Sequence, residues 1–371
     1  MLDSLRLENF KGFKQVDVPL RPLTLLSGIN SMGKSTVLQS LALLRQSYYQ
    51  RMLIDDKHTQ QSLVLNGDLV TLGTGKDLIF ESAPKNKIEL SLTFFDSKAN
   101  WVFDYDRSGN VLQNGIYTPT GIASIFETGL FTNNFHYLQA ERIGPRTSSG
   151  MDNYLVNVRN ELGSKGEFAA HYLHLHESQK VDPAMLHPFI DASETLLGQV
   201  QAWMNEISLG TQIRLLPRED LDLMQVSIGT EGMAEFRRPT NVGFGISYTL
   251  PILVAILSSQ PNALVLLENP EAHLHPKGQA QMGHLMARAV SAGVQIILET
   301  HSDHILNGIR IAVREHILSP DKVALHFFTR AENFQQDGLT FSSPKLDAFG
   351  RLDHWPENFF DEWDRSLDKL L

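Results

Sequence analysis

A run near the N-terminus has the composition and spacing of a loop that binds phosphate. Residues 28–35 read Gly-Ile-Asn-Ser-Met-Gly-Lys-Ser and fit the pattern G-x-x-x-x-G-K-[ST], in which glycines let backbone N–H groups curl around an anion. We expect Lys34 to be an exposed side chain that neutralises the β- and γ-oxygens of a nucleotide, and Ser35 to offer its hydroxyl to Mg²⁺. The residues predicted to bind the nucleotide here are Asn30, Ser31, Met32, Gly33, Lys34, Ser35 and Thr36.

Two more clusters of polar residues follow apolar runs that have the composition of buried strands. Residues 268–271 (Glu-Asn-Pro-Glu) come directly after the run 263–267, and residues 299–301 (Glu-Thr-His) come directly after 294–298. The carboxyl ends of parallel strands meet at the edge of the sheet where α/β proteins place ligand-binding groups. We therefore expect both clusters at one edge, the edge that also carries the phosphate loop.

The elements that must position these residues alternate between strand and helix patterns. The expected elements are a hairpin at 5–20, a strand at 23–27, a helix at 37–48, a strand at 263–267, a helix at 277–292, a strand at 294–298, a helix at 304–314 and a strand at 323–329. Such alternation implies a mostly parallel sheet with crossover helices, which is an α/β fold.

Three segments depart from this pattern. Residues 62–112 alternate apolar and polar side chains between turn signals, which predicts an antiparallel β arm. Residues from about 155 to 206 lean helical and predict a helical insertion, and residues 359–370 form an amphipathic stretch at the C-terminus. The apolar face of that stretch could close the core or dock a partner.

Composition and charge exclude several classes of protein. The 371 residues are 42% hydrophobic, and the longest apolar stretch, at 248–257, is about half the length of a membrane span. With no cysteine and no apolar leader, we expect a cytoplasmic protein without membrane contact. The net charge of −10 argues against a surface that binds nucleic acid everywhere, which leaves a local basic groove at Arg214, Arg218, Arg237 and Arg238 or a charge-balanced face.

Two histidine clusters and several aromatic residues leave alternatives open. His171, His174 and His176, like His273 and His275, have metal-like spacing, but four-ligand zinc sites without cysteine are uncommon, so surface histidines explain them more simply. Trp203, Trp355 and Trp363 are expected to pack in the core or an interface. The side chains of Phe10 and Phe13 would either stack on adenine or fill the core of the first hairpin.

Taken in order, the motifs resemble the RecF, SMC and OLD group of ABC ATPases. The resemblance rests on Asn-Phe-Lys at 9–11, Gly-x-Asn-x-x-Gly-Lys-Ser-Thr at 28–36, Asn-Pro-Glu-Ala-His-Leu-His-Pro at 269–276 and Glu-Thr-His-Ser at 299–302. Within that group, the chain is similar to short stand-alone bacterial ATPases without a long coiled coil or a fused nuclease. The resemblance implies the P-loop NTPase fold of an ABC-type ATPase head, bearing the β arm and the helical insertion.

The resemblance also implies roles for single residues. Glu268 stands at the Walker B carboxylate, Asn269 at the catalytic carboxylate, His275 in the D-loop and His301 at the switch histidine. The signature loop corresponds to residues 241–247, where Gly243, Gly245 and Ser247 would cap a nucleotide. Gln139 is the weaker candidate for the Q-loop, so the implied metal-binding residues are Ser35, Gln139 and Glu268.

The sequence departs from the family pattern at the residue that should act as the base. A Glu-Asn pair at 268–269 replaces the usual Asp-Glu pair. Asn269 can orient a water molecule but cannot accept its proton, as a general base must. Glu271 and Glu299 are the substitute carboxylates, and we expect ATP hydrolysis to be slow.

These inferences divide the chain into four segments. They are an ATPase lobe with the phosphate loop and β arm at 1–150, a helical insertion at 151–235, a second ATPase lobe with the signature-like loop, Walker B residue and switch histidine at 236–330, and a C-terminal tail at 331–371.

The function that the resemblance implies is an ATP-dependent switch. Two copies would sandwich two nucleotides with Mg²⁺ and control a separate effector, such as a nuclease, in bacterial anti-phage defence. The alternatives are a RecF-like DNA-repair ATPase that clamps DNA and a scaffold that binds ATP without hydrolysing it. A transporter ATPase is the least expected, because about two hundred residues separate the phosphate loop from the signature-like loop.

Overall fold

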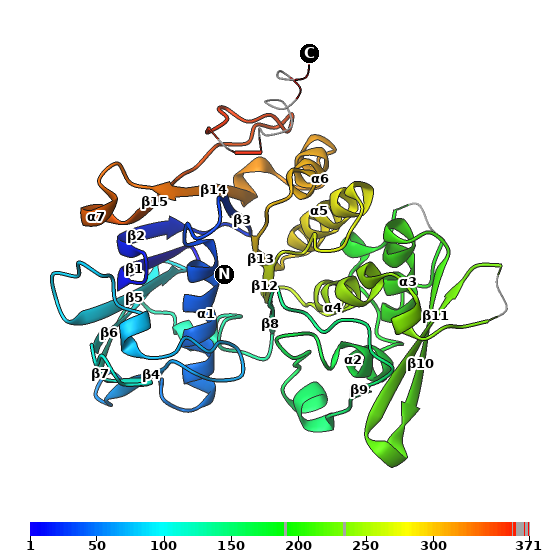
Figure 1. Ribbon diagram of the computed structural model, residues 1–371, viewed down its shortest axis with the longest axis horizontal. Coiled ribbons are helices and arrows are strands. Elements are labelled where there is room, and N and C mark those ends of the chain that lie inside the picture. Colours follow the sequence, from blue (N-terminus) through cyan, green and yellow to red (C-terminus); the bar gives the residue numbers. More distant parts are fainter. Residues whose placement is uncertain (189–190, 233–234, 358, 361–366, 368–369, 371) are drawn as a thin grey trace. The chain divides into compact units, whose positions relative to one another are not determined.

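The computed structural model describes residues 1–371 except 189–190, 233–234, 358, 361–366, 368–369 and 371 (Figure 1). The chain divides into two compact units. Unit 1 comprises Met1–Thr132, Asp321–Asp347 and Leu352–Leu371, and unit 2 comprises Asn133–Pro320 and Ala348–Arg351. The division of the chain into the four segments given above stays a prediction.

Unit 1 contains an antiparallel sheet with the strand order β2-β1-β5-β6-β7-β4. Its strands are β1 (Ser4–Phe10), β2 (Phe13–Pro19), β4 (Gln61–Val64), β5 (Lys87–Phe94), β6 (Ser97–Asp104) and β7 (Val111–Thr120). Alternate residues of β1 point into the core, so that Leu5 and Leu7 are fully buried. The first hairpin and the β arm are therefore confirmed, and both belong to one sheet. Phe10 and Phe13 are fully buried at the hairpin turn, which favours the hairpin-core interpretation over stacking on adenine.

Unit 1 also carries the strand and the helix that flank the phosphate loop. The strand β3 (Leu23–Gly28) pairs in parallel with β14 (Val323–Arg330), which pairs antiparallel with β15 (Leu339–Ser342). The helix α1 (Lys34–Tyr49) follows the loop, and the single-turn helix α7 (Phe334–Asp337) precedes β15. Helix α1 is buried on most sides, so its apolar residues serve as core rather than as one stripe.

Unit 2 contains three parallel strands with crossover helices. The strands are β8 (Phe135–Leu138), β12 (Leu264–Glu268) and β13 (Gln295–Glu299), and the helices are α4 (Phe244–Ser258), α5 (Pro276–Ser291) and α6 (Asp303–Arg314). Helices α5 and α6 lie side by side (Figure 1). Their backbones can approach closely because a glycine stands on each helix at the contact. A Cβ on Gly283 would lie 2.3 Å from the Ile305 carbonyl oxygen, and one on Gly308 would lie 2.0 Å from that of Ala280. The predicted α/β alternation in the last third of the chain is confirmed.

The segment expected to be a helical insertion also contains strands. It holds the helices α2 (Ala169–Leu175) and α3 (Leu196–Ile207) together with a sheet of β9 (Ser149–Gly150), β10 (Thr211–Arg218) and β11 (Leu223–Thr230). The helical prediction for 155–206 is wrong over much of its length, because Pro183 and Pro188 interrupt the chain between two short helices. The β10–β11 hairpin was not predicted, although Ile213 and Leu215 alternate with polar residues there.

The structure settles some of the side-chain alternatives. Trp203 is buried and its indole N–H donates to the Met185 carbonyl oxygen at 3.1 Å, as the core interpretation predicts, whereas Trp355 is half exposed. His171 is fully buried, so it is not the surface histidine that we expected. Within the described residues, no group of three or more His, Asp or Glu side chains could hold a metal ion. In the proposed basic groove, Arg218 pairs with Asp220 at 3.4 Å and Arg214 stacks over Phe236.

The C-terminal stretch is described only in part. Asp361, Glu362, Trp363 and Asp364, which belong to the amphipathic stretch at 359–370, lie outside the described residues. Phe359 is fully buried and packs against Phe327 at 5.5 Å between ring centroids, so this residue belongs to the core of unit 1. Among the described helices, none combines the length and the apolar character needed to cross a membrane.

Candidate nucleotide site

The phosphate loop joins β3 to the first turn of α1 and depends on two glycines. Gly28 has a φ of 140° and Gly33 a φ of 88°, conformations that side chains disfavour. A Cβ on Gly28 would lie 2.5 Å from the Phe328 carbonyl oxygen, and one on Gly33 would lie 2.6 Å from the Phe13 ring. Gly33 is also the N-cap of α1, so the loop leads directly into the N-terminus of a helix, which is the end that favours anions.

The side chain of Lys34 is buried inside this loop. It is only 3% exposed, and its Nζ donates to the carbonyl oxygens of Gly28 at 2.9 Å and Ile29 at 3.0 Å. The expectation of an exposed lysine is therefore wrong. The reason is that the loop curls back over the first turn of α1 and presents its carbonyl oxygens to the ammonium group.

The other predicted binding residues of the loop differ in exposure. Asn30 and Ser31 are exposed, Met32 and Ser35 are partly buried, and Thr36 is buried at the base of α1. Their roles in binding a nucleotide stay predictions.

Glu268 ends β12 in unit 2 with both carboxylate oxygens in hydrogen bonds. The Tyr137 hydroxyl donates to Oε1 at 2.6 Å, and the Ala140 backbone N–H donates to Oε2 at 3.1 Å. Burial, followed by the nearby charge of Glu268, raises the pKa of Tyr137 well above its usual range, so the hydroxyl keeps its proton. Glu268 is thus a buried, fully oriented carboxylate at the carboxyl end of a parallel strand.

Glu299 is the neighbour of Glu268 across the sheet. The two residues are paired in the parallel register of β12 and β13, and Glu299 is buried. The prediction that the two strands bring their polar clusters to one edge holds within unit 2. That this edge also serves the phosphate loop stays a prediction.

Asn269 has the backbone conformation of a tight turn. Its φ is 44°, a left-handed value that asparagine tolerates better than most residues, and its N–H donates to the Glu299 carbonyl oxygen at 2.9 Å. The side-chain Oδ1 is buried and accepts no hydrogen bond from the described residues. An acceptor of this kind is suited to a water molecule or a ligand group.

Glu271 connects the turn after β12 to the segment after β13. Its Oε2 accepts from the Thr300 hydroxyl at 2.8 Å, and its Oε1 accepts from the His301 backbone N–H at 2.8 Å. Glu271 therefore holds the backbone of His301, the predicted switch histidine, whose side chain is exposed. A role for Glu271 as the substitute base stays a prediction.

The Gln139 segment approaches Glu268 through its backbone. The Gln139 N–H donates to the Ser164 carbonyl oxygen at 2.9 Å, and its carbonyl oxygen accepts from Arg142 at 2.9 Å. Arg142 also donates to the carbonyl oxygens of Glu268 and Asn269, both at 2.6 Å. The structure thus brings Gln139, Glu268 and Asn269 together, with Arg142 bonded to all three.

The signature-like loop, residues 241–247, leads into α4 and includes its first turn. Gly243 is the N-cap of the helix, and a Cβ on Gly245 would lie 2.8 Å from the His273 carbonyl oxygen. The Phe244 and Tyr248 rings both pack on His273, at 5.5 Å and 4.6 Å between centroids. The turn is therefore anchored to the segment that follows Asn269, and His275 in that segment is the N-cap of α5.

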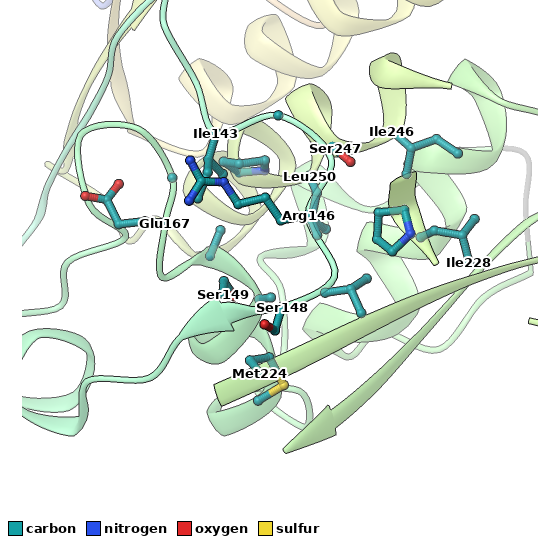
Figure 2. Close-up of a pocket in the computed structure, with 17 residues that line it drawn as sticks. Ile143, Arg146, Ser148, Ser149, Glu167, Met224, Ile228, Ile246, Ser247 and Leu250 are labelled. Atoms are coloured by element: carbon teal, nitrogen blue, oxygen red, sulfur yellow. The ribbon is translucent and has the colours of Figure 1, made fainter. Parts of the chain in front are cut away.

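Ser247 faces a small apolar pocket on the inner side of this turn. Figure 2 shows Ile246, Ser247 and Leu250 of α4 opposite Met224 and Ile228 of β11. The pocket has a volume of about 60 Å³, and its lining is mostly apolar. The capping of a nucleotide by Gly243, Gly245 and Ser247 stays a prediction.

Three family models match parts of the chain. A family model described as an AAA ATPase domain matches residues 1–200, more than half of the 371 residues, and includes the phosphate loop. The chain belongs to this AAA ATPase domain family. A second family model is described as "AAA domain, putative AbiEii toxin, Type IV TA system". It matches residues 159–307 of this chain. A third, described as a protein of unknown function (DUF3696), matches residues 318–370, and no curated protein matches the chain.

Solved structures show the fold of this AAA ATPase domain protein. An Smc head bound to the C-winged helix domain of ScpA aligns with 93% of the chain and 98% of its own length, at 14% identity and a TM-score of 0.56. An Smc head with an extended coiled coil, bound to the C-terminal domain of ScpA and derived from Pyrococcus furiosus, aligns with 100% of the chain and 99% of its own, at 14% identity and a TM-score of 0.52. The protein therefore has the ABC-class ATPase head fold that the resemblance to RecF, SMC and OLD predicted.

Two residues of the site were not predicted to have a role. Tyr137 and Arg142 flank Gln139 in the sequence, and they hold the side chain and the backbone of Glu268, respectively. The available signal was a tyrosine inside an apolar run and an arginine three residues beyond Gln139. Neither feature indicates its partner, which lies more than a hundred residues away.

Proposed function

We propose that this AAA ATPase domain protein is an ATP-dependent dimeric switch that hydrolyses ATP slowly and controls a separate effector. The observation that carries the proposal is the phosphate loop, in which Gly28 and Gly33 adopt glycine-type conformations and Gly33 begins a helix. In this proposal the loop binds the phosphates of ATP, and Ser35, Gln139 and Glu268 hold Mg²⁺.

In the proposed site, Glu268 would order the outer shell of a bound Mg²⁺. Both oxygens of Glu268 already accept hydrogen bonds, which suits a carboxylate that orders the outer shell of the ion. Bound Mg²⁺ would neutralise charge on the phosphate oxygens. The chain itself contributes the orientation of Glu268 and the buried acceptor Oδ1 of Asn269, which can hold a water molecule in place.

The effector and the role in anti-phage defence are supported by resemblance and by similarity. The description of the second matched model includes the words "putative AbiEii toxin, Type IV TA system", and the similar Smc heads were solved with a domain of a second protein, ScpA. Co-purification from the native operon tests the proposal, because a switch should retain its effector. A protein that emerges alone and binds duplex DNA in a salt-dependent way would instead support the DNA-clamping ATPase.

Substitutions at the signature-like turn should block dimerisation without blocking ATP binding. The chain has one phosphate loop and one signature-like turn, so a composite site needs two copies. We expect ATP with Mg²⁺ to shift the wild type toward a dimer in light scattering, and Gly245→Asp or Ser247→Arg to abolish that shift. Gly150→Asp is a matched control, because Gly150 is exposed, has no positive φ, and a Cβ there would come no closer than 4.0 Å to another residue. A molar mass that does not depend on nucleotide at any concentration would contradict the dimer.

Glu271→Gln should remove most of the hydrolysis while ATP still binds. The amide can keep both hydrogen bonds by accepting from the His301 N–H and donating to the Thr300 hydroxyl, but it cannot accept a proton from water. We expect turnover to fall at least about tenfold. Thr300→Val is the control, since it removes the two hydrogen bonds of the Thr300 hydroxyl, to Glu271 and from the Ser302 N–H, and leaves the carboxylate. A rate that survives both Glu271→Gln and Glu299→Gln would show that neither carboxylate is the base.

A further inference from the structure

Arg142 bonds to two segments of unit 2 that carry predicted site residues. Its Nη1 donates to the carbonyl oxygen of Gln139 at 2.9 Å and to that of Glu268 at 2.6 Å, and its Nη2 donates to that of Asn269 at 2.6 Å. The side chain is only 2% exposed. One buried cation therefore fixes the backbone at two of the predicted metal-binding residues, Gln139 and Glu268, and at Asn269 in the catalytic position.

The same guanidinium reaches the signature-like turn. It lies over the ring of Tyr248, 5.5 Å from the centroid, within the range of a cation–π contact. Tyr248 directly follows Ser247 on α4, and its ring packs edge-on against His273. A displacement of α4 would therefore also displace the turn after β12, through the contacts of Tyr248 with Arg142 and His273.

An arginine in this place is costly to bury. Burial lowers the pKa of Arg142 to about 10, against the opposing charges of Glu271 and Glu268. An apolar side chain would fill the same volume without that cost. What the guanidinium adds is a rigid, planar set of donors that can hold several carbonyl oxygens at fixed separations.

We propose that Arg142 is a positioning residue that sets Gln139, Glu268 and Asn269 relative to the signature-like turn, so that hydrolysis and ATP-dependent self-association both depend on it. The inference rests on the proposed function. It assigns Arg142 no contact with the nucleotide.

The test compares Arg142→Lys with Arg288→Lys. Lysine keeps the positive charge, but a single ammonium group cannot reproduce the planar donor set. Arg288, a half-buried arginine on α5, is the matched control. Its side chain donates to the carbonyl oxygen of one residue, Ala184, at 3.0 Å. For Arg142→Lys we expect the Kd for ATP to stay within about threefold, since the phosphate loop is untouched, while kcat falls at least about tenfold.

Hydrogen exchange provides a second readout that does not need activity. We expect the amides of residues 264–275 and 241–250 to exchange at least about fivefold faster in nucleotide-free Arg142→Lys than in the wild type, and no such change in Arg288→Lys.

The outcomes separate the two proposals. If the wild type binds ATP and Arg142→Lys matches Arg288→Lys in kcat, exchange and self-association, the role of Arg142 is refuted while the proposed function stands. If the wild type does not bind ATP, the proposed function fails. Unchanged exchange in Arg142→Lys would then also remove the structural basis of the inference.

Discussion

Replacing Lys34 by alanine is expected to weaken ATP binding at least about a hundredfold. Charge-assisted hydrogen bonds are worth about 1.5–3 kcal/mol each, and an ammonium that contacts two phosphate oxygens would lose two of them. About 1.4 kcal/mol corresponds to a tenfold change in Kd, so a loss of about 3 kcal/mol or more is a hundredfold or more. Calorimetric titration with ATP and Mg²⁺ measures the effect directly.

The buried position of Lys34 requires a control for the loop itself. Because Nζ donates to the carbonyl oxygens of Gly28 and Ile29, the alanine variant loses two contacts inside the loop as well as the partner of a phosphate. Thermal unfolding should therefore accompany the titration, with Lys14→Ala as the control on the surface of the same unit, where Lys14 pairs with Asp337 at 3.5 Å. An unchanged Kd in a folded Lys34→Ala protein would disprove the phosphate-loop assignment.

Replacing Asn269 by aspartate is expected to raise the rate of hydrolysis at least about tenfold. We expect the wild type to turn over more slowly than about 1 s⁻¹, the lower end of the usual range for enzymes. A positioned general base contributes about 10²–10⁴-fold, and aspartate would place a carboxylate oxygen where Oδ1 of Asn269 is buried without a partner among the described residues. Aspartate also tolerates the left-handed conformation at φ 44°.

The matched control for this gain is Asn262→Asp. Asn262 also has a positive φ, 69°, but it lies on an exposed turn, so the same exchange there should leave turnover unchanged. Steady-state release of phosphate measures both variants. A wild-type rate well above 1 s⁻¹, or an Asn269→Asp rate no higher than that of the wild type, would show that the missing carboxylate does not limit the reaction.

Much of the fold follows from patterns within short segments. The hairpin at 5–20, the β arm, and the strands and helices of the last third are visible as period-two or helical spacing, because each pattern reflects which face of one element is buried. The insertion was predicted less well. Residues 211–218 and 223–230 form a hairpin, and the exposed β10 carries apolar residues such as Leu216 on its outer side, which blurs the alternation.

The same distinction applies to the site. The phosphate loop could be located from the sequence because its conformation depends on neighbouring residues, chiefly Gly28 and Gly33, whose positive φ values need no distant partner. The clusters after β12 and β13 could be located for a similar reason, since each comes directly after a buried strand.

What only the tertiary structure decided is which of these residues hold one another. Arg142 and Glu268 are 126 residues apart, and Glu271 reaches Thr300 and His301 across 29 and 30 residues. Those contacts depend on the register that pairs Glu268 with Glu299, and on the turn that leaves Asn269 at a positive φ. Which strands become neighbours is decided by packing between segments far apart in the sequence, which is why the roles of Tyr137 and Arg142 were found only in the folded chain. The buried side chain of Lys34 was also found only there, because the path of the loop brings the carbonyl oxygens of Gly28 and Ile29 to its Nζ.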